Sequence, residues 1–202
     1  MHVSSGVLKG LQVDVPKQIR PTEGKVRQAI FNILSAVLPG ARVLDACAGS
    51  GVLGLEALSR GAASVAFVDS DSTCIRAIRA TLARVPADQV GEWAVYAGDV
   101  LKQVRALAQR GERFDLILCD PPYKDPVGKT ALRLVGSCGI LTRSGVLCLE
   151  HAASEQLPAA VDDLELMKQH RYGGTVLSFY KVAERPEAAC QTEQPPASDR
   201  TP

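Results

Sequence analysis

The fold is decided by the stretch Leu44-Asp45-Ala46-Cys47-Ala48-Gly49-Ser50-Gly51-Val52-Leu53-Gly54. Residues 42–46 predict a buried strand, and residues 52–60 predict a helix. A strand, a glycine-rich turn and a helix together open a nucleotide-binding α/β unit. Glycine has no Cβ, so the backbone of this turn can approach a ligand closely. We therefore expect cofactor contacts at Gly49, Ser50 and Gly51.

The next strand, residues 64–69, ends in an acid. The carboxylate of Asp69 can accept hydrogen bonds from both hydroxyls of a ribose. A helix cap is the other interpretation of Asp69, but Asp71 or Ser72 is better placed to cap the helix predicted over residues 73–85. We expect a ribose-bearing cofactor at Asp69 and Ser70. The Gly49-x-Gly51-x-x-Gly54 spacing also fits dinucleotide-binding proteins, so these residues leave the identity of the cofactor open.

Asp45 distinguishes between the candidate cofactors. An acid four residues before Gly49, at the end of the first strand, is typical of S-adenosylmethionine-dependent methyltransferases. There it can orient the ammonium group of the cofactor. A pyrophosphate bound at the same turn would gain nothing from a second negative charge. A third strand is predicted over residues 92–97. In the methyltransferase fold, Asp99 and its neighbour Val100 follow this strand and are placed to reach the adenine amine.

A second motif, Asp120-Pro121-Pro122-Tyr123, follows the apolar run of residues 114–119. Two prolines cannot continue a central strand, because each lacks a backbone N–H. The acid and the prolyl carbonyls therefore project from the carboxyl edge of the predicted sheet, where open α/β sheets bind ligands. The carboxylate and a prolyl carbonyl can accept from a planar amine, and Tyr123 can stack on its ring. A solvated turn is the alternative interpretation of the motif alone.

Strands and helices alternate along the rest of the chain. Further strands are predicted near residues 113–119 and 145–150, and further helices near residues 100–110 and 127–138. Regular alternation predicts a mostly parallel α/β sheet covered on both faces. The segments Asp163–His170 and Thr175–Val182 predict a closing hairpin, and a reversed last strand marks the class I S-adenosylmethionine-dependent methyltransferase sheet. Before the sheet, we expect a hairpin over residues 2–15 and a helix from Thr22, its cap, to about Val37.

The chain resembles the RsmD family of bacterial enzymes, which methylate guanine N2 in 16S ribosomal RNA. The resemblance covers Val3 to about Val182 and lies in four stretches. These are Val3-Ser4-Ser5-Gly6-x-x-Lys9-Gly10-Leu11, Arg20-Pro21-Thr22-x-x-x-Val26-Arg27-x-x-x-Phe31-Asn32-x-Leu34, the glycine turn with Leu55-Glu56-Ala57-Leu58-Ser59-Arg60-Gly61-Ala62, and the Asp120–Tyr123 motif. One departure is the opening Met1-His2-Val3-Ser4-Ser5-Gly6, where the family usually has a basic Arg-x-Ile-x-Gly.

The resemblance implies S-adenosylmethionine as cofactor and guanine 966, in the numbering of that RNA, as the target. It implies a substrate in a partly assembled small-subunit particle. The expected catalytic residues are Asp120, Pro121, Pro122 and Tyr123. The expected substrate contacts are Arg20, Thr22 and Tyr123, although capping the first helix is an equally good account of Thr22.

Composition excludes several classes of protein. The net charge is +1, which argues against strong non-specific binding of nucleic acid. Residues 1–42 hold six basic and two acidic residues, a net of +4, which predicts a modest basic face or an ordinary solvated surface. The six cysteines include no Cys-x-x-Cys pair and share no metal spacing with the three histidines. We expect no metal, no membrane segment, reduced thiols in a cytoplasmic protein, and a monomer.

We expect one methyltransferase domain over residues 1–183, with residues 1–38 facing RNA, and a disordered tail over residues 184–202. Three rival functions stay open. A DNA adenine-N6 methyltransferase would use the same motif but normally needs a separate recognition region. A protein-glutamine methyltransferase usually has Asn in place of Asp120. A dehydrogenase or non-catalytic nucleotide-binding module would leave the Asp120–Tyr123 motif unexplained.

Overall fold

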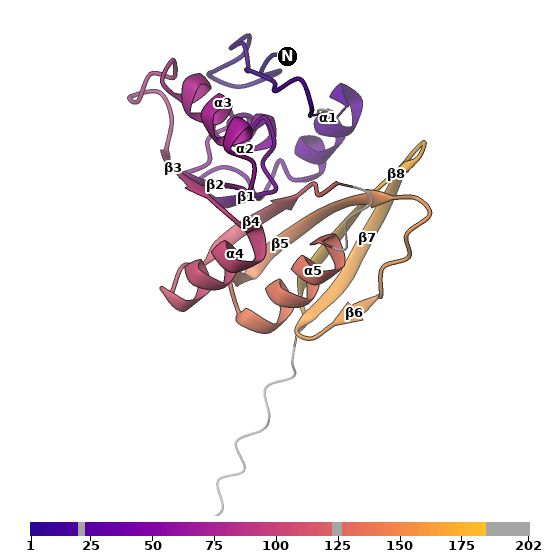
Figure 1. Ribbon diagram of the computed structural model, residues 1–202. Coiled ribbons are helices and arrows are strands. Elements are labelled where there is room, and N and C mark those ends of the chain that lie inside the picture. The colour runs from indigo at the N-terminus through magenta and orange to yellow at the C-terminus, as the bar shows by residue number, and fades with distance from the viewer. Residues whose placement is uncertain (20–22, 123–126, 185–202) are drawn as a thin grey trace, which may run out of the picture.

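A computed structural model describes residues 1–19, 23–122 and 127–184 (Figure 1). These residues form one sheet of eight strands in the order β3-β2-β1-β4-β5-β8-β7-β6. The strands are β1 (Arg42–Ala46), β2 (Ser64–Asp69), β3 (Glu92–Ala97), β4 (Phe114–Cys119), β5 (Leu141–Ala152), β6 (Ala160–Val161), β7 (Leu164–Tyr172) and β8 (Thr175–Val182). The helices are α1 (Gly24–Ile33), α2 (Val52–Ser59), α3 (Ser72–Leu82), α4 (Val100–Gln109) and α5 (Val127–Cys138).

The sheet has the predicted mixed topology. Strands β3, β2, β1, β4 and β5 are parallel, whereas β8 lies antiparallel between β5 and β7. The reversed last strand confirms the class I methyltransferase arrangement. The order reverses direction between β1 and β4, so the connections after these two strands leave a crevice at their carboxyl ends.

Two apolar layers cover the faces of the sheet, because side chains alternate along each strand. Val43 of β1 joins the layer packed by α1, α2 and α3. Leu44, the next residue, joins the layer packed by α4 and α5. The sheet is therefore buried on both sides, as parallel sheets usually are.

Strand β5 is longer than the predicted 145–150. Phe114 of β4 pairs with Leu141, and Leu116 pairs with Val146, so β5 carries extra residues at this irregular point. The hydroxyl of Thr142 donates to the carboxylate of Asp115 at 3.0 Å and fixes the irregularity. This cross-strand bond has no signature in the local pattern of the chain.

Helix α1 differs at both ends from the predicted 22–37. It begins at Gly24, with Glu23 in the cap position and no side-chain cap, so the predicted cap at Thr22 is wrong. It ends at Ile33, because Val37 and Leu38 both donate to the carbonyl of Leu34 and close a turn. Helix α3 likewise ends at Leu82 rather than residue 85, while the predicted cap at Asp71 is confirmed by its 2.7 Å bond from the Thr73 amide.

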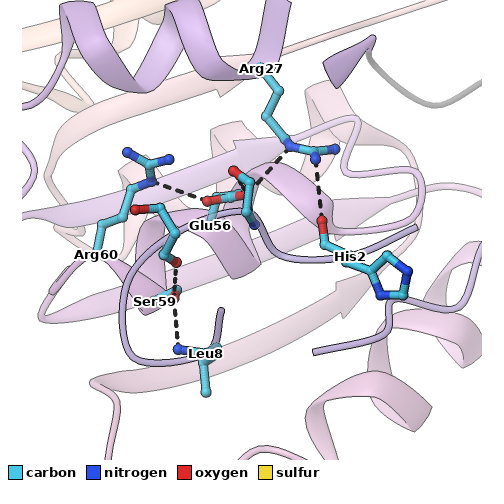
Figure 2. A network of polar contacts seen from close by, with 8 residues as sticks. His2, Leu8, Arg27, Glu56, Ser59 and Arg60 are labelled. Carbon is cyan, nitrogen blue, oxygen red and sulfur yellow. Dashed lines mark hydrogen bonds and ion pairs between the residues drawn. The ribbon is translucent and has the colours of Figure 1, made fainter. Parts of the chain in front are cut away.

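The first 13 residues form a loop with paired ends rather than a regular hairpin. Its only bridge among the described residues is His2 with Gln12. Glu56 of α2 holds this loop: its buried carboxylate accepts from the Ser4 amide and hydroxyl and pairs with Arg60 at 3.1 Å. Arg27 of α1 approaches the same carboxylate at 3.4 Å and donates to the His2 carbonyl at 3.2 Å (Figure 2). One buried acid thus joins the loop, α1 and α2.

Candidate active site

A cleft of about 1170 Å³ opens at the carboxyl ends of the parallel strands. The turn after β1 lines this cleft. Asp69 at the end of β2, Asp99 after β3, Asp120 after β4 and Glu150 of β5 line it as well. Residues on both sides of the segment 20–22 line one wall, and the β7–β8 turn lines the wall near β5. The cleft therefore lies at the point where the strand order reverses.

Some residues of the glycine turn line the cleft, and others allow close packing of α2. Gly49 and Ser50 line the cleft. Gly51 does not: it has φ +75°, caps α2, and a Cβ there would lie 2.8 Å from Ile78 Cγ1. A Cβ at Gly54 would lie 2.2 Å from the ring of Phe67. Gly51 and Gly54 therefore let α2 approach α3 and the sheet, while Gly49 leaves space for a ligand.

Asp69 lines the cleft and organises its surroundings. One carboxylate oxygen accepts from the Gly49 amide at 2.7 Å, and the other accepts from the Asp71 amide at 2.8 Å. These bonds hold the glycine turn and the start of α3 against the end of β2. They leave each oxygen with a further lone pair for a ribose hydroxyl. Ser70, the next residue, lines the cleft and is exposed.

Asp99 and Val100 also line the cleft. Asp99 caps α4, since its carboxylate accepts from the Lys102 amide at 2.8 Å. This capping role keeps the carboxylate at the mouth of the cleft. Val100 is buried and presents an apolar surface beside it.

Asp45 lies beneath the cleft and does not line it. It is 1% exposed, and its carboxylate accepts from the Gly54 amide at 2.8 Å. Burial raises the pKa of this carboxyl to about 8, and the charges of Asp120 and Asp69 add to the rise, although the bond from Gly54 opposes it. In this geometry Asp45 supports the start of α2 from within the protein, so any effect on a cofactor passes through the glycine turn.

Asp120, Pro121 and Pro122 line the cleft directly after β4. Because β4 pairs with β1, this motif lies beside the glycine turn, as its place in the predicted sheet requires. Tyr123, Arg20 and Thr22 lie outside the described residues. Their neighbours Pro122, Ile19 and Glu23 line the cleft.

Sequence reasoning missed two parts of the cleft. Glu150 follows the apolar run of β5, just as Asp120 follows the apolar run of β4. An acid at this position in the sequence would have been enough to predict that Glu150 lies at the cleft. The β7–β8 turn, Tyr172–Thr175, gave no such signal, because only the tertiary structure brings it to the cleft. Cys47 is half-buried and lines the cleft with φ +63°. A bond with the Cys119 thiol and burial raise the pKa of the Cys47 thiol, so this thiol stays protonated.

The basic residues of positions 1–42 are not all available to a ligand. Arg27 is buried against Glu56, and Arg42 pairs with Glu112. Lys9, Lys17 and Lys25 are exposed, and Lys25 lines the cleft. The face that this part of the chain offers to phosphates is therefore less basic than its composition predicts.

No cluster of metal-ligating side chains occurs in the part of the chain that the structure describes. Among the same residues, no helix combines the length and the apolar character that crossing a membrane requires.

Comparison with known proteins decides the family. The sequence model of the family described as Conserved hypothetical protein 95, the RsmD family, matches residues 1–181. The chain belongs to the RsmD family. Within that family it is 37% identical over 183 residues to "Putative rRNA methyltransferase YlbH" of Bacillus subtilis, covering 90% of this chain and 98% of the relative. It is 28% identical to "Ribosomal RNA small subunit methyltransferase D" of Escherichia coli, covering 90% and 89%.

The fold comparison agrees. The solved structure titled "Putative methyltransferase yhhF from Escherichia coli" has a TM-score of 0.79 and 27% identity, covering 90% of this chain and 97% of that one. This chain also shows a shorter match to the "tRNA1(Val) (adenine(37)-N6)-methyltransferase" of Shewanella putrefaciens. The two are 35% identical over 85 residues, which is 41% of this chain.

The cofactor of this RsmD-family chain is S-adenosylmethionine, and the residues present fit it. Asp69, at the end of β2, lines the cleft, where its carboxylate would accept hydrogen bonds from the ribose hydroxyls, and Asp99, after β3, lines the same cleft. At Gly49, the nearest atom to an added Cβ is 3.6 Å away, in Ile19, so the turn leaves room for a ligand. When bound, S-adenosylmethionine supplies an electrophilic methyl group on its sulfonium.

Proposed function

We propose that this protein methylates the N2 amine of a guanine in 16S ribosomal RNA, guanine 966 in the family's numbering, on a partly assembled small subunit. The observation that carries the proposal is that one cleft holds both groups suited to a cofactor and groups suited to an amine. Asp69 and Gly49 supply the cofactor side, and Asp120 with its prolines supplies acceptors for an amine at the neighbouring strand end. The relatives named as ribosomal RNA methyltransferases span nearly the whole domain.

The proposed chemistry follows from the acceptors at Asp120. Guanine N2 is a poor nucleophile, because its lone pair is delocalised into the ring. The Asp120 carboxylate and the Pro121 carbonyl accept the two amine hydrogens, orient the nitrogen and favour a localised lone pair. No base is required before the transfer, since the proton leaves afterwards.

Substrate recognition in this proposal includes residues known only from the sequence. Tyr123 stacks on a base taken out of its own stack, and Arg20 and Thr22 contact RNA. Residues 1–38, with the exposed Lys9, Lys17 and Lys25, face the RNA. Because Arg27 and Arg42 are held in internal pairs, few charges remain to bind naked RNA by counterion release. The small number of free charges favours a substrate RNA that ribosomal proteins have already folded. In this proposal the enzyme acts as a monomer in the cytoplasm.

The test is methyl transfer from labelled S-adenosylmethionine to three substrates. We expect activity to fall in the order partly assembled small subunits, protein-free 16S RNA and duplex DNA, with N2-methylguanosine as the digested product. Preferential labelling of DNA, or of a protein, would overturn the proposal.

Adenine N6 is the second candidate acceptor, because the 85-residue match includes a relative named as an adenine-N6 methyltransferase of a transfer RNA. A cleft that offers acceptors to an exocyclic amine suits both bases. The same digestion decides between them: N6-methyladenosine in place of N2-methylguanosine would favour this second function.

A further inference from the structure

Glu150 occupies the position on β5 that Asp120 occupies beyond β4. Cys119 and Leu149 are register partners in this parallel pair, and each acid is the next residue. Neighbouring strands lie about 4.8 Å apart, so the two carboxylates start from adjacent points of the same sheet edge. Both line the cleft. Asp120 is half-buried, whereas Glu150 is 5% exposed.

The strand end that carries Glu150 is rigid. His151 donates from Nδ1 to the Ala152 carbonyl at 3.0 Å, so its Nε2 accepts from the Ser178 hydroxyl at 2.7 Å. That hydroxyl in turn accepts from the Gln169 amide at 2.9 Å. The chain of bonds joins β5, β8 and β7 directly behind Glu150. Burial lowers the pKa of His151, which keeps the ring neutral as this pattern requires.

The β7–β8 turn completes this side of the cleft. Ala152 pairs with Thr175, and the Ala153 amide donates to the Gly174 carbonyl at 2.8 Å. The turn is therefore fixed beside the end of β5. Pro121, Pro122 and this turn line the same cleft as Asp120 and Glu150.

A guanine offers this pair of acids a matching edge. Its N2 amine and its N1–H are neighbouring donors, and a carboxylate accepts only. Adenine presents an N1 lone pair next to its amine, which a carboxylate would repel. Resting on the proposed function, we infer that Glu150 is a specificity residue: it accepts the guanine N1–H while Asp120 accepts from N2.

The test changes the N1 and C6 edge of the substrate base and keeps its N2 amine. Small-subunit particles are reconstituted with 16S RNA that carries either guanine or 2,6-diaminopurine at the methylated position. Diaminopurine keeps the N2 amine but has an N1 acceptor in place of N1–H. We expect wild-type protein to prefer guanine by about 100-fold or more, because the Glu150 carboxylate would face the N1 lone pair of the analogue instead of an N1–H donor.

The variant is Glu150→Gln, and the matched control is Glu155→Gln. An amide can donate to the N1 acceptor, so Glu150→Gln should reduce the preference for guanine to about tenfold or less. Glu155 pairs with Lys129 at 3.6 Å and does not line the cleft, so its variant should keep the wild-type preference. Binding of S-adenosylhomocysteine should be the same in all three proteins.

Each outcome separates this inference from the function on which it rests. An equal preference in wild type and Glu150→Gln, with guanine methylated by both, would overturn the role of Glu150 alone. Wild-type protein that methylates both bases within tenfold would overturn it without any variant, even if Glu150→Gln failed to fold. Failure of wild type to methylate guanine in any particle would instead overturn the proposed function.

Discussion

Asp45, near the end of β1, and Asp69, at the end of β2, carry the same chemical group in different environments. Asp69 lines the cleft with two backbone donors, whereas Asp45 is enclosed with one. An enclosed carboxyl resists ionisation, because burial removes the water that would stabilise its charge. The acid typical of methyltransferase sequences at this spacing is thus buried beneath the site rather than on its surface.

Replacing Asp120 by Asn should lower methyl transfer by about 100-fold or more, because the amide lacks the charge and can present an NH2 to the amine. Affinity for S-adenosylhomocysteine should change little, since the cofactor side of the cleft is intact. Single-turnover kinetics and calorimetry measure the two quantities. Asp88→Asn, an exposed change away from the cleft, serves as control and should leave both unchanged. Turnover within tenfold of wild type would contradict the role.

Asp45 should make the cofactor-free protein less stable as pH rises. Its folded pKa of about 8 exceeds the ordinary 3.8, so between these values the unfolded chain has lost a proton that the folded chain keeps. The free energy of unfolding then falls by up to about 1.4 kcal/mol per pH unit from this group. Asp45→Asn cannot ionise and should flatten the decline between pH 5.5 and 8 in urea denaturation. Parallel curves for variant and wild type would contradict this.

At the scale of elements, close packing and backbone hydrogen bonds hold the N-terminal loop as much as the charge of Glu56 does. Gly6 has φ +81°, and an added Cβ would lie 1.8 Å from the Ser59 carbonyl oxygen. Around it, the amides of Val7 and Leu8 donate to the Ser59 carbonyl and hydroxyl, each at 2.8 Å. The loop is therefore docked on the end of α2, on the far side of the glycine turn.

Two glycine variants separate backbone strain from crowding. Gly10 has φ +90° and nothing within 4 Å of an added Cβ. Gly10→Ala should therefore cost only the strain of a left-handed residue, about 1–2 kcal/mol of unfolding free energy. Gly6→Ala should cost about 1–3 kcal/mol more, because the carbonyl must move. Urea denaturation of both variants measures the difference, and equal losses would show that the loop is loosely docked.

Glu56 should be far more important to stability than an exposed acid in a similar pair. Glu56→Gln leaves Arg27 buried beside a neutral partner, and we expect a loss of about 3–5 kcal/mol. Glu112→Gln, which weakens the exposed pair with Arg42, should cost about 1 kcal/mol or less. Hydrogen exchange at the Val7 and Leu8 amides should rise only in the Glu56 variant. Equal losses in the two variants would remove the case for Glu56 as the anchor of the loop.

At the scale of the molecule, one sheet brings the two halves of the site together. Strand β1, which positions the glycine turn, pairs with β4, which positions Asp120, although some 70 residues separate them. The antiparallel β8 then brings the β7–β8 turn to the same edge. Such a site depends on the whole sheet, so long-range pairing must be complete before the cleft exists.

Removing residues 186–202 should leave the melting temperature and the methyl transfer rate unchanged. The last strand ends at Val182 and the family match ends at residue 181, so the deleted part lies beyond both. Its sequence has four Pro and no apolar periodicity, which gives it little to bury. Calorimetry and the methylation assay compare the two lengths of chain, and a clear drop in either quantity would contradict this.

The sequence by itself predicted the alternation of strands and helices, the reversed last strand and the residues of the glycine turn. These features depend on the local periodicity of apolar residues and on the conformational limits of glycine and proline. Both can be recognised within a short segment of the sequence. For the same reason, the acid at the end of β2 and the acids that follow β3 and β4 could be assigned to one edge of the sheet, and Asp69, Asp99 and Asp120 do line one cleft.

Only the tertiary structure decided which of these groups face the cleft. Burial of Asp45 depends on α2 covering it, and the role of Glu56 depends on a loop more than 50 residues away. The β7–β8 turn reaches the site because β8 inserts between β5 and β7. Contacts of this kind join residues that are distant in the chain, so the periodicity of a single segment carries no record of them.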